Sequence, residues 1–546
     1  MIGQKIKNTR MQTGWLCLVF AVSLSACGGG SGQGPTTNAT TQNGSSVIVT
    51  NTTGQNNQGT QSGANSTSIG AANGDGYFPD ANGHYPNALG IYPDKDGRYP
   101  SSAEAGFFAN DQGVARAYSV DGPIDDALKA QNVFFKAFGN GRSCASCHRA
   151  EEGFSITPQS LHERFVNSAG EDAIFQVNDG ANSPLAKFAT LDEKEFAFSM
   201  LLTKGLIRVG MKIPDNAEFE LVKVDDPYHF SSPQELSLFR RPLASANLRF
   251  LSEVMWDGRE TTVDSKGSTC LPNGTCFASL DQSLAKQAHN ATLGHAQAAQ
   301  GLSQEEQAAV LKFEKSLIST QIFDREARFL DVAGARGGPN FLINTTYYFG
   351  INDLNFGNIK TGAAFNPNVM QNFSAWLNAS GNPNPQVDAK RRAIARGEQL
   401  FNTRTFNPLN DGTVLNDLKI PSNRVTCSAC HNTPQVGSAS TPFAANIFTT
   451  IPALRTPDQV LFTLRNKKTG MLLKTLDPGV AMTSGRWEDI GRFKVPSLRG
   501  LSARPPYFHD GSAESIFDVV SHYDRTFSMQ LTGQEITDLV AFLGAL

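Results

Sequence analysis

Four segments with a helical spacing of apolar residues dominate the hydrophobic pattern of the chain. Two of them, residues 124–139 (IDDALKAQNVFFKAFG) and 389–402 (AKRRAIARGEQLFN), are amphipathic. Two others, residues 302–317 and 531–546, have helical apolar periods that begin with a capping box. Strand signals are weak and scattered, and glycine and proline are plentiful, which is typical of long loops. The pattern predicts a mainly α fold with long loops.

The helical segments recur in the same order, which indicates an internal duplication. Phe313 and Phe542 each lie eleven residues after the leucine that opens their segment. Related motifs lie ahead of these two segments: MWDGRE from residue 255 and YFHDGS from residue 507. The sequence therefore predicts two tandem modules of a few helices each.

The N-terminus predicts export and lipid attachment. A positively charged start precedes the apolar run GWLCLVFAVSLSAC, which ends at Cys27 and is short for a membrane span. The sequence LSAC at residues 24–27 resembles the bacterial lipobox, in which the cysteine is lipidated and becomes the new N-terminus. We interpret residues 1–27 as a lipoprotein signal peptide, with an ordinary signal peptide as the alternative. Gly28 favours sorting to the outer membrane, facing the periplasm or the cell surface.

Two segments of unusual composition follow the predicted signal. Residues 28–76 consist largely of Gly, Ser, Thr, Asn and Gln, with too few apolar side chains to order themselves, and predict a flexible tether. From Phe78 to Pro100 an aromatic–proline pair recurs every seven residues. Because proline favours extended backbone, residues 77–109 are predicted to form a strap on the protein surface.

Length and composition bound the number of folded units and the class of partner. At 546 residues the chain is longer than a single core supports. Its net charge of −3 argues neither for nucleic acid nor for a strongly charged partner, and no nucleic-acid partner is expected. Among eight cysteines, Cys270 and Cys276 flank the turn sequence LPNGT. In an exported protein such a pair predicts a local disulfide, with two reduced thiols as the alternative.

Four other cysteines belong to two Cys-x-x-Cys-His motifs. This motif attaches c-type haem, because its thiols add to the vinyl groups and the adjacent histidine supplies an axial nitrogen to iron. Zinc sites use a different spacing. Each motif follows one of the amphipathic segments. The sequence predicts two covalent haems, with these attachment residues and proximal ligands: Cys144, Cys147 and His148, and Cys427, Cys430 and His431.

Together these motifs resemble the bacterial dihaem cytochrome c peroxidases and their relatives of the MauG type. The resemblance also rests on WDGRE from Trp256, QA from Gln287, and FKVPSLRGLSARPPYFHDGSAESIFDVVSHY from Phe493. It implies two tandem cytochrome c-like haem domains: a peroxidatic N-terminal domain, 110–388, and an electron-transfer C-terminal domain, 389–546. Trp256 matches the tryptophan between the two haems of that family, and its alternative role is that of a core side chain.

The residues expected at the peroxide site depart from the family pattern. The peroxidases carry a glutamate ten residues after the glutamine of QA, and here that position is Gln297. Glutamine cannot accept and return a proton in the same way, whereas imidazole titrates near neutral pH. His295 is therefore the candidate acid/base residue, with a surface or propionate-bound histidine as the alternative. Gln287 is expected to be a polar group over the distal face.

The expected distal iron ligands depart from the pattern as well. Typical peroxidases bind methionine to the C-terminal iron, fourteen residues after the histidine of YFHDG. Counting from His509 gives Tyr523, as in MauG-type enzymes, with His509 and Met529 as competing ligands. For the first haem, His162 lies fourteen residues after His148 and is the candidate removable ligand, with a helix-surface histidine as the alternative.

The resemblance further implies a calcium ion between the two halves, held partly by backbone carbonyls just before YFH. Arg504 and Pro506 stand at those places. The asparagine ligand expected before WDGR has no clear counterpart, because RRPLASANLRF aligns with a gap. Calcium binding therefore stays open at this point.

Three functions agree with these observations. The first is reduction of hydrogen peroxide with electrons from a small c-type cytochrome or cupredoxin. The second is a MauG-like oxidation of a protein or organic substrate by peroxide. The third is non-enzymatic electron transfer with both irons six-coordinate. An open distal position on the first haem separates the first two from the third, and the distal ligand of the second haem separates the first from the second.

Overall fold

The computed structural model describes residues 106–261, 269–408 and 424–546, all within one compact unit, Ile69–Leu546. The predicted signal peptide and tether, and the predicted strap up to residue 105, lie outside the described residues. The division predicted between residues 388 and 389 stays a prediction.

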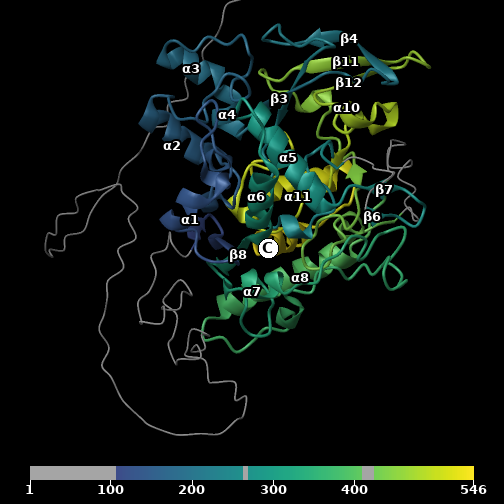
Figure 1. Cartoon of the computed structure of the whole chain (residues 1–546). Helices are drawn as coiled ribbons and strands as arrows, with labels where there is room; N and C mark the ends of the chain where they lie inside the picture. Colours follow the sequence, from purple (N-terminus) through teal and green to yellow (C-terminus); the bar gives the residue numbers. More distant parts are fainter. Residues whose placement is uncertain (1–105, 262–268, 409–423) are drawn as a thin grey trace, which may run out of the picture. The chain divides into compact units, whose positions relative to one another are not determined.

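The elements follow one another along the chain as Figure 1 labels them. The α-helices are α1 (Asp126–Gln131), α2 (Pro158–Ser168), α3 (Leu191–Ala197), α4 (Ser199–Lys204), α5 (Leu280–Gly294), α6 (Gln304–Ser316), α7 (Gly338–Ile343), α8 (Pro385–Thr403), α9 (Cys427–Cys430), α10 (Ala481–Ser484), α11 (Ile516–Thr526) and α12 (Gly533–Gly544). The strands are β1 (Phe107–Asn110), β2 (Gly113–Ser119), β3 (Ile207–Met211), β4 (Phe219–Asp225), β5 (Leu236–Arg240), β6 (Thr269–Cys270), β7 (Cys276–Phe277), β8 (Leu317–Asp324), β9 (Arg328–Phe329), β10 (Ala444–Ala445), β11 (Leu461–Asn466), β12 (Leu472–Thr475) and β13 (Phe493–Lys494).

The prediction of a mainly α fold, a pair of helical cytochrome c-like modules, is wrong. Helix takes up 33% of the structure and strand 16%, so the fold is mixed α/β. The strands form small antiparallel sheets with the orders β1-β2-β8-β9, β12-β11-β4, β3-β5, β10-β13 and β6-β7. β2 pairs with β8 far along the chain, and its residues alternate between buried and half-buried. Such short strands carry little local signal, because their stability comes from packing against distant partners.

The strongest helical predictions are confirmed. Residues 389–402 lie within α8, and the two closing segments form α6 and α12. The side chains of Ser303 and Thr532 accept hydrogen bonds from backbone N–H groups three residues later, as the capping boxes predict. Residues 124–139 form only the short helix α1, because the chain passes into a 3-10 turn at Val133–Phe135.

The predicted disulfide is also confirmed. Cys270 and Cys276 are bonded to each other. The bond joins β6 to β7, which pair antiparallel across the turn that separates them.

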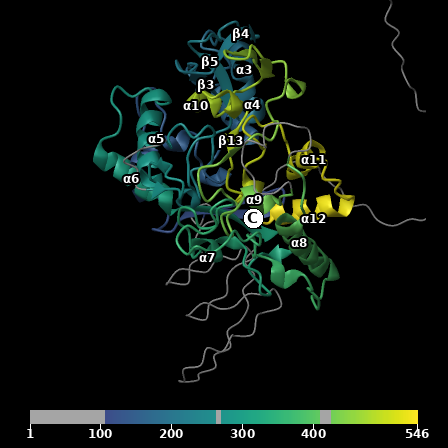
Figure 2. The same cartoon turned by 90° about the vertical axis from the view of Figure 1, so that its right-hand side faces the viewer.

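Two contacts organise the core of the chain: a sheet that joins strands from its two halves, and a pair of packed helices. In the upper part of Figure 1, β11 lies between β12 and β4, so strands far apart in sequence share one sheet. In Figure 2, α8 and α12 lie side by side, and they enclose the buried side chains of Phe401 and Phe542.

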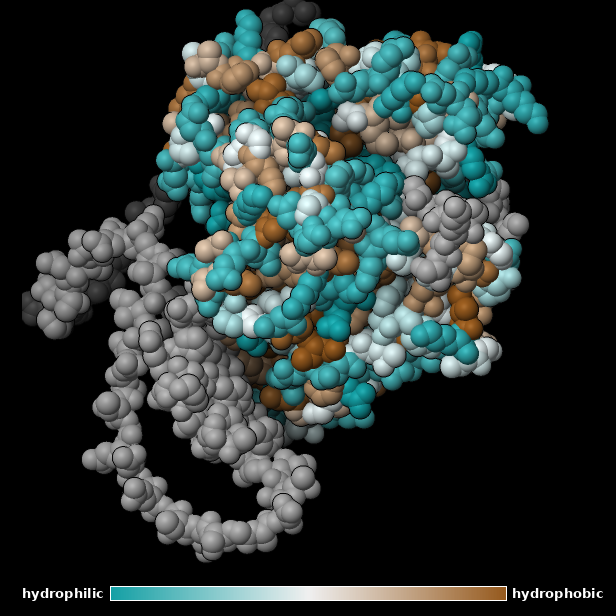
Figure 3. All heavy atoms as spheres, viewed as in Figure 1, coloured by the Kyte–Doolittle hydropathy of each residue, from teal (hydrophilic) through white to brown (hydrophobic). Residues whose placement is uncertain are grey.

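Polar residues cover much of the face shown in Figure 3, with apolar residues scattered among them. Within the described residues, no helix is both long enough and apolar enough to cross a bilayer.

The close packing of α8 on α12 yields a test. A Cβ added at Gly397 would collide with the backbone oxygen of Asp538 and lie 2.7 Å from the Cβ of Phe542. We expect Gly397→Ala to lower the free energy of unfolding by about 1–3 kcal/mol through overpacking, as measured by urea denaturation. Gly533→Ala is the control, because a Cβ there meets nothing within 4 Å. Equal stability of the two variants would contradict this packing.

Candidate functional site

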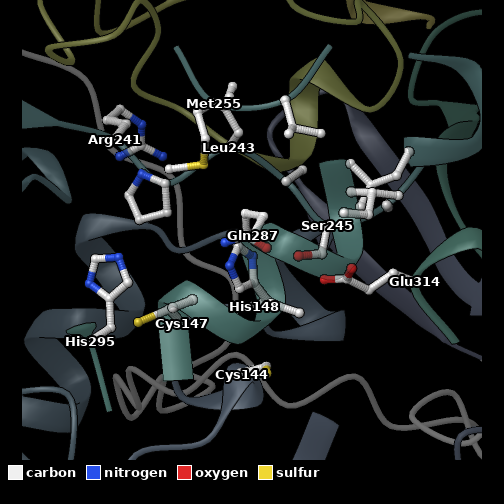
Figure 4. A pocket seen from close by; sticks show the side chains of 18 of the residues that line it. Cys144, Cys147, His148, Arg241, Leu243, Ser245, Met255, Gln287, His295 and Glu314 are labelled. Carbon is white, nitrogen blue, oxygen red and sulfur yellow. The ribbon is translucent and has the colours of Figure 1, made fainter. Parts of the chain in front are cut away.

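The first haem motif lies in the wall of a large cavity. Cys144, Cys147 and His148 all line this first cavity, whose empty volume is about 1660 Å³ including its open part. The backbone N–H of His148 donates to the carbonyl of Cys144 at 3.0 Å, so the motif forms one helical turn. Figure 4 shows the imidazole in the middle of the lining residues.

The second haem motif lies in a second cavity of similar size, about 1730 Å³. Cys427, Cys430 and His431 line it. The backbone N–H of His431 donates to the carbonyl of Cys427 at 3.1 Å, so the same helical turn occurs again. The internal duplication predicted from sequence therefore has a structural counterpart at the two motifs.

Both histidines are oriented in the same way. Nδ1 of His148 donates to the carbonyl of Phe154 at 3.0 Å, and Nδ1 of His431 donates to the carbonyl of Gly437 at 2.6 Å. In each case the acceptor lies six residues after the histidine. Such a bond fixes the tautomer and leaves Nε2 free to bind a metal. Burial lowers the pKa of His431 to about 4 and also lowers the pKa of His148, so both rings are neutral.

The closing helices support these histidines with aromatic rings. Phe313 of α6 packs on Phe134, which lies 6.5 Å from the His148 ring, centroid to centroid. Phe542 of α12 packs on Phe401, which lies 6.2 Å from the ring of His431. The matched phenylalanines of the sequence repeat thus have matched positions in the structure.

One wall separates the two cavities. These residues line both of them: Arg241, Pro242, Leu243, Trp256, Lys494, Pro496 and Arg504. The indole N–H of Trp256 donates to the backbone carbonyl of Arg241 at 2.8 Å. Its ring lies 6.4 Å from His509, centroid to centroid, in an edge-to-face arrangement. Trp256 is therefore the aromatic group between the two candidate haem sites.

The residues around the cavities fit haem in their charge as well as in their shape. Arg499 lines the first cavity, is 1% exposed, and its two terminal nitrogens have no hydrogen-bond partner among the described residues. Arg241, Lys494 and Arg504 are further cations of the shared wall. A buried charge is costly unless it is paired. Each haem brings two propionate carboxylates, which are the anions that this wall lacks.

The predicted catalytic residues Gln287 and His295 both line the first cavity. Nδ1 of His295 lies 2.5 Å from Oδ2 of Asp179, which also forms an ion pair with Arg142. The ion pairs lower the pKa of Asp179, although its burial opposes this. The imidazole is 38% exposed and lies on the same side as Cys147 in Figure 4. His295 is thus an oriented histidine at the mouth of the cavity.

Glu314 is a site residue that the sequence did not reveal. It lies in α6, directly after Phe313, and lines the first cavity near Ser245 (Figure 4). Its Oε2 atom is buried without a hydrogen-bond partner. Burial raises the pKa of Glu314 to about 8, so its carboxyl holds a proton at neutral pH. An amphipathic pattern alone cannot reveal such a group, because glutamate is common on helix surfaces.

The structure brings all three candidate ligands of the second haem to the second cavity. Tyr523, His509 and Met529 line it together with His431. Among the described residues, none hydrogen-bonds to the hydroxyl of Tyr523, whereas Nδ1 of His509 lies 3.3 Å from the hydroxyl of Thr449. The ring of His509 also stacks on Phe493 at 4.0 Å. Among the three candidates, His509 is the one whose ring is engaged by these contacts.

The structure does not bring His162 to the first cavity. His162 lies on the exposed face of α2, and the residues that line the cavity do not include it. Leu161 and Phe165 form the buried face of the same helix. This position agrees with the alternative interpretation of His162 as a histidine on a helix surface.

The implied calcium ion does not fit the residues at its expected place. The backbone carbonyls of Arg504 and Pro505 accept hydrogen bonds from the guanidinium of Arg241. Within residues 106–546, leaving out the two undescribed segments, no group of three or more His, Cys, Asp or Glu side chains could hold a metal ion. A cationic side chain thus binds the carbonyl of Arg504, one of the two expected ligands, whereas the carbonyl of the other, Pro506, is not among its acceptors.

Comparison with known proteins gives partial matches to peroxidases. The chain is 34% identical over 82 residues to cytochrome-c peroxidase IdrP1 of Pseudomonas sp. (strain SCT), which is 13% of this chain and 22% of that protein. It is 30% identical over 131 residues to cytochrome-c peroxidase IdrP2 of Denitromonas iodatirespirans, 22% of this chain and 35% of that protein. It is 29% identical over 125 residues to cytochrome c551 peroxidase of Nitrosomonas europaea, 22% of this chain and 30% of that protein.

These matches span about a fifth to a third of the length of the curated relatives. No family model matches the chain. Among solved structures, hydrazine synthase of Kuenenia stuttgartiensis aligns with 72% of this chain and 93% of its own, at 14% identity and a TM-score of 0.27, too low to indicate a shared fold. Part of the chain is therefore similar to cytochrome c peroxidases.

The raised pKa of Glu314 predicts a pH dependence of stability. Its ordinary pKa of 4.5 applies to the unfolded chain, so folding takes up a proton between pH 4.5 and about 8. The stabilisation by this carboxyl is complete below pH 4.5 and is lost as pH rises through 8, by up to roughly 1.4 kcal/mol per pH unit. We expect Glu314→Gln to flatten the decline of the unfolding free energy from pH 5 to 8.

Glu163→Gln, a change on the exposed face of α2, is the control for this experiment. Urea denaturation of the three proteins at several pH values measures the effect. A Glu314→Gln curve parallel to that of the wild type would rule out a protonated Glu314.

Proposed function

We propose that the chain is an exported dihaem peroxidase that reduces hydrogen peroxide with electrons from a small c-type cytochrome or cupredoxin. The observation that carries the proposal is the pair of cavities, each with a Cys-x-x-Cys-His turn and an oriented imidazole, on either side of Trp256. The partial similarity to cytochrome c peroxidases supports the same activity.

The reaction requires two electrons and two protons for each peroxide, which becomes two molecules of water. Bound haem supplies iron that binds the peroxide oxygen and exchanges single electrons. His148 and His431 hold the two irons through Nε2, since their Nδ1 atoms are engaged. Trp256 provides an aromatic path through the shared wall, which shortens the gap that electrons must cross.

The protons are delivered by groups that line the first cavity. His295 is oriented by Asp179, and this pairing holds the imidazole ready to exchange a proton with solvent at the mouth of the cavity. Glu314 is protonated at neutral pH and lies deeper in the protein. Gln287 contributes a fixed polar group. In this proposal Glu314 takes on the proton-donating role for which Gln297 is unsuited.

Tyr523 favours a second candidate function, the oxidation of another substrate by peroxide. Its hydroxyl faces the second cavity without a hydrogen-bond partner among the described residues, as a phenolate ligand requires. An anionic oxygen ligand lowers the reduction potential of iron relative to a thioether, because it stabilises the ferric charge. Such a haem stores an oxidising equivalent better than it accepts electrons from a donor. In this case the oxidised substrate would lose two electrons and two protons to peroxide.

Location is part of the proposal. Residues 1–27 carry the features of a lipoprotein signal peptide, and the residues that follow are typical of a tether. We infer a mature chain that begins at a lipidated Cys27 and is anchored to the outer membrane. Radioactive palmitate labelling of the wild type and of Cys27→Ser in the native host tests this anchor.

Haem content and peroxide binding test the proposed function. We expect two covalent haems by intact mass, and one haem in each variant that replaces both cysteines of a motif with alanine. Loss of the Cys144 and Cys147 attachment should abolish peroxide turnover, whereas loss of the Cys427 and Cys430 attachment should leave a haem that still binds small ligands. A wild-type protein whose spectra do not change with peroxide in either oxidation state would favour the electron-transfer alternative.

The spectrum of Tyr523→Phe distinguishes the two enzymatic candidates. If the phenol binds the second iron, its loss opens the site and changes the ferric spectrum. Tyr507→Phe is the matched control, because Tyr507 lines the same cavity but its hydroxyl donates to the carbonyl of Leu501 at 3.1 Å. We expect a changed spectrum for Tyr523→Phe and a wild-type spectrum for Tyr507→Phe. Identical spectra for both would exclude Tyr523 as a ligand and favour the simple peroxidase.

A further inference from the structure

A buried guanidinium joins the segments that separate the two cavities. Arg241 follows β5, is 4% exposed and lines both cavities. Its terminal nitrogens donate only to backbone carbonyls among the described residues. The acceptors are the oxygens of Lys204 at 2.6 Å, Ile156 at 2.8 Å, Pro505 at 3.3 Å and Arg504 at 3.4 Å.

Backbone oxygens, and not carboxylates, surround the positive charge of this guanidinium. Among the described residues, no carboxylate lies within ion-pair distance of Arg241. Burial and the nearby charge of Arg504 lower the pKa of Arg241 to about 9, so it keeps its charge at neutral pH. Its charge is therefore balanced by oxygen atoms of the backbone. Backbone carbonyls that converge on one positive charge are also the ligands by which proteins hold calcium.

This charge lies beside the place where calcium was expected: it binds the carbonyl of Arg504, one of the two expected ligands, and that of Pro505, the neighbour of the other, Pro506. Arg504 and Pro505, whose carbonyls accept from Arg241, directly precede the PYFH sequence. Two other acceptors, Ile156 and Lys204, come from the N-terminal half. One side chain thus connects the two halves and binds one of the two carbonyls that the family resemblance assigns to a metal ion.

A glycine leaves the space that the guanidinium of Arg241 occupies. Gly205 directly follows Lys204 and has a φ of +64°, a left-handed conformation that favours glycine. A Cβ at this position would collide with Nη1 of Arg241. The glycine therefore serves both the turn at the end of α4 and the close approach of the guanidinium.

The backbone of the same residue holds groups of both cavities. The carbonyl of Arg241 accepts the indole N–H of Trp256, and its N–H donates to the carbonyl of His509 at 2.7 Å. Displacement of Arg241 would therefore move the aromatic group between the cavities and a candidate ligand of the second one. The cation at this position controls how the two sites are aligned.

We propose that the guanidinium of Arg241 is a built-in cation that takes the place of calcium at the junction of the two cavities, so that their alignment does not depend on a metal ion. The proposal goes beyond the peroxidase activity and holds whether or not the chain reduces peroxide, because it concerns the junction alone. Its readouts are calcium binding and thermal stability.

The first test uses the mature, haem-loaded wild-type protein. We expect no heat of binding in a calorimetric titration with CaCl₂, and the same melting temperature in excess EGTA as in excess CaCl₂. A ligand that binds the native state raises the melting temperature with its concentration. A calcium-dependent rise of the wild-type melting temperature, with saturable binding, would overturn the proposal without the need for any variant.

The second test replaces the charge with a side-chain oxygen. Arg241→Asn should lower the melting temperature by several degrees in EGTA, and CaCl₂ should restore part of the loss in a saturable way. MgCl₂ should not, because Mg²⁺ demands a smaller and stricter geometry than carbonyls of the backbone offer here. Arg325→Asn is the control, because Arg325 is exposed and donates to a single carbonyl, that of Asn110, at 3.1 Å.

A rival role for Arg241 gives a different outcome. If its only function were to pair with a haem propionate, Arg241→Asn would change the haem spectra but would gain no response to calcium. A folded Arg241→Asn protein with two haems and a melting temperature insensitive to calcium would therefore contradict the proposal. Gly205→Ala keeps the arginine but displaces it, and should lower the melting temperature as well.

Discussion

Two large internal cavities are the constraint on which the rest of the structure depends. Side chains around an empty space lose packing contacts. Both cavities are lined largely by apolar side chains and each carries a Cys-x-x-Cys-His motif, so each is suited to hold a large apolar group. The cysteine pair in each wall permits covalent attachment, which keeps that group in place without a binding equilibrium. The packing around the two cavities, the charges in their walls and the chemistry of the site are all arranged around such a group.

The buried charges follow from the same constraint. Arg499 has two terminal nitrogens without partners, and Lys494 has Glu253 as its charged neighbour. Burial lowers the pKa of Lys494 to about 8 and raises the pKa of Glu253 to about 7, whereas the attraction between the two groups favours the charged form of each. A wall of this kind is stable only when anions are placed against it. The propionates of haem are such anions, so the cofactors complete the electrostatics as well as the packing.

The sequence could predict the parts of the site that depend on local spacing. The Cys-x-x-Cys-His turns and the capping boxes at Ser303 and Thr532 were accessible from counting residues, whereas Tyr523 and His509 became candidates only through the resemblance to the peroxidase family. The sheet of β4 and β11 was not, because its pairing joins residues of the two halves through contacts that leave no local pattern. Glu314 was missed for the same reason: its burial is set by the cavity, not by its own helix.

Arg241 illustrates the physical difference between a metal ion and a side chain in one position. A bound ion stabilises the native state by an amount that rises with its free concentration, so the alignment of two sites that it joins varies with the surroundings. A guanidinium is always present and always charged near neutral pH, and its planar donors fix the directions of the carbonyls that they bind. That rigidity requires the rest of the junction to be built around it, as Gly205 and its left-handed backbone show. In a junction of this kind, the position of Trp256 in the wall between the two cavities does not vary with the calcium concentration.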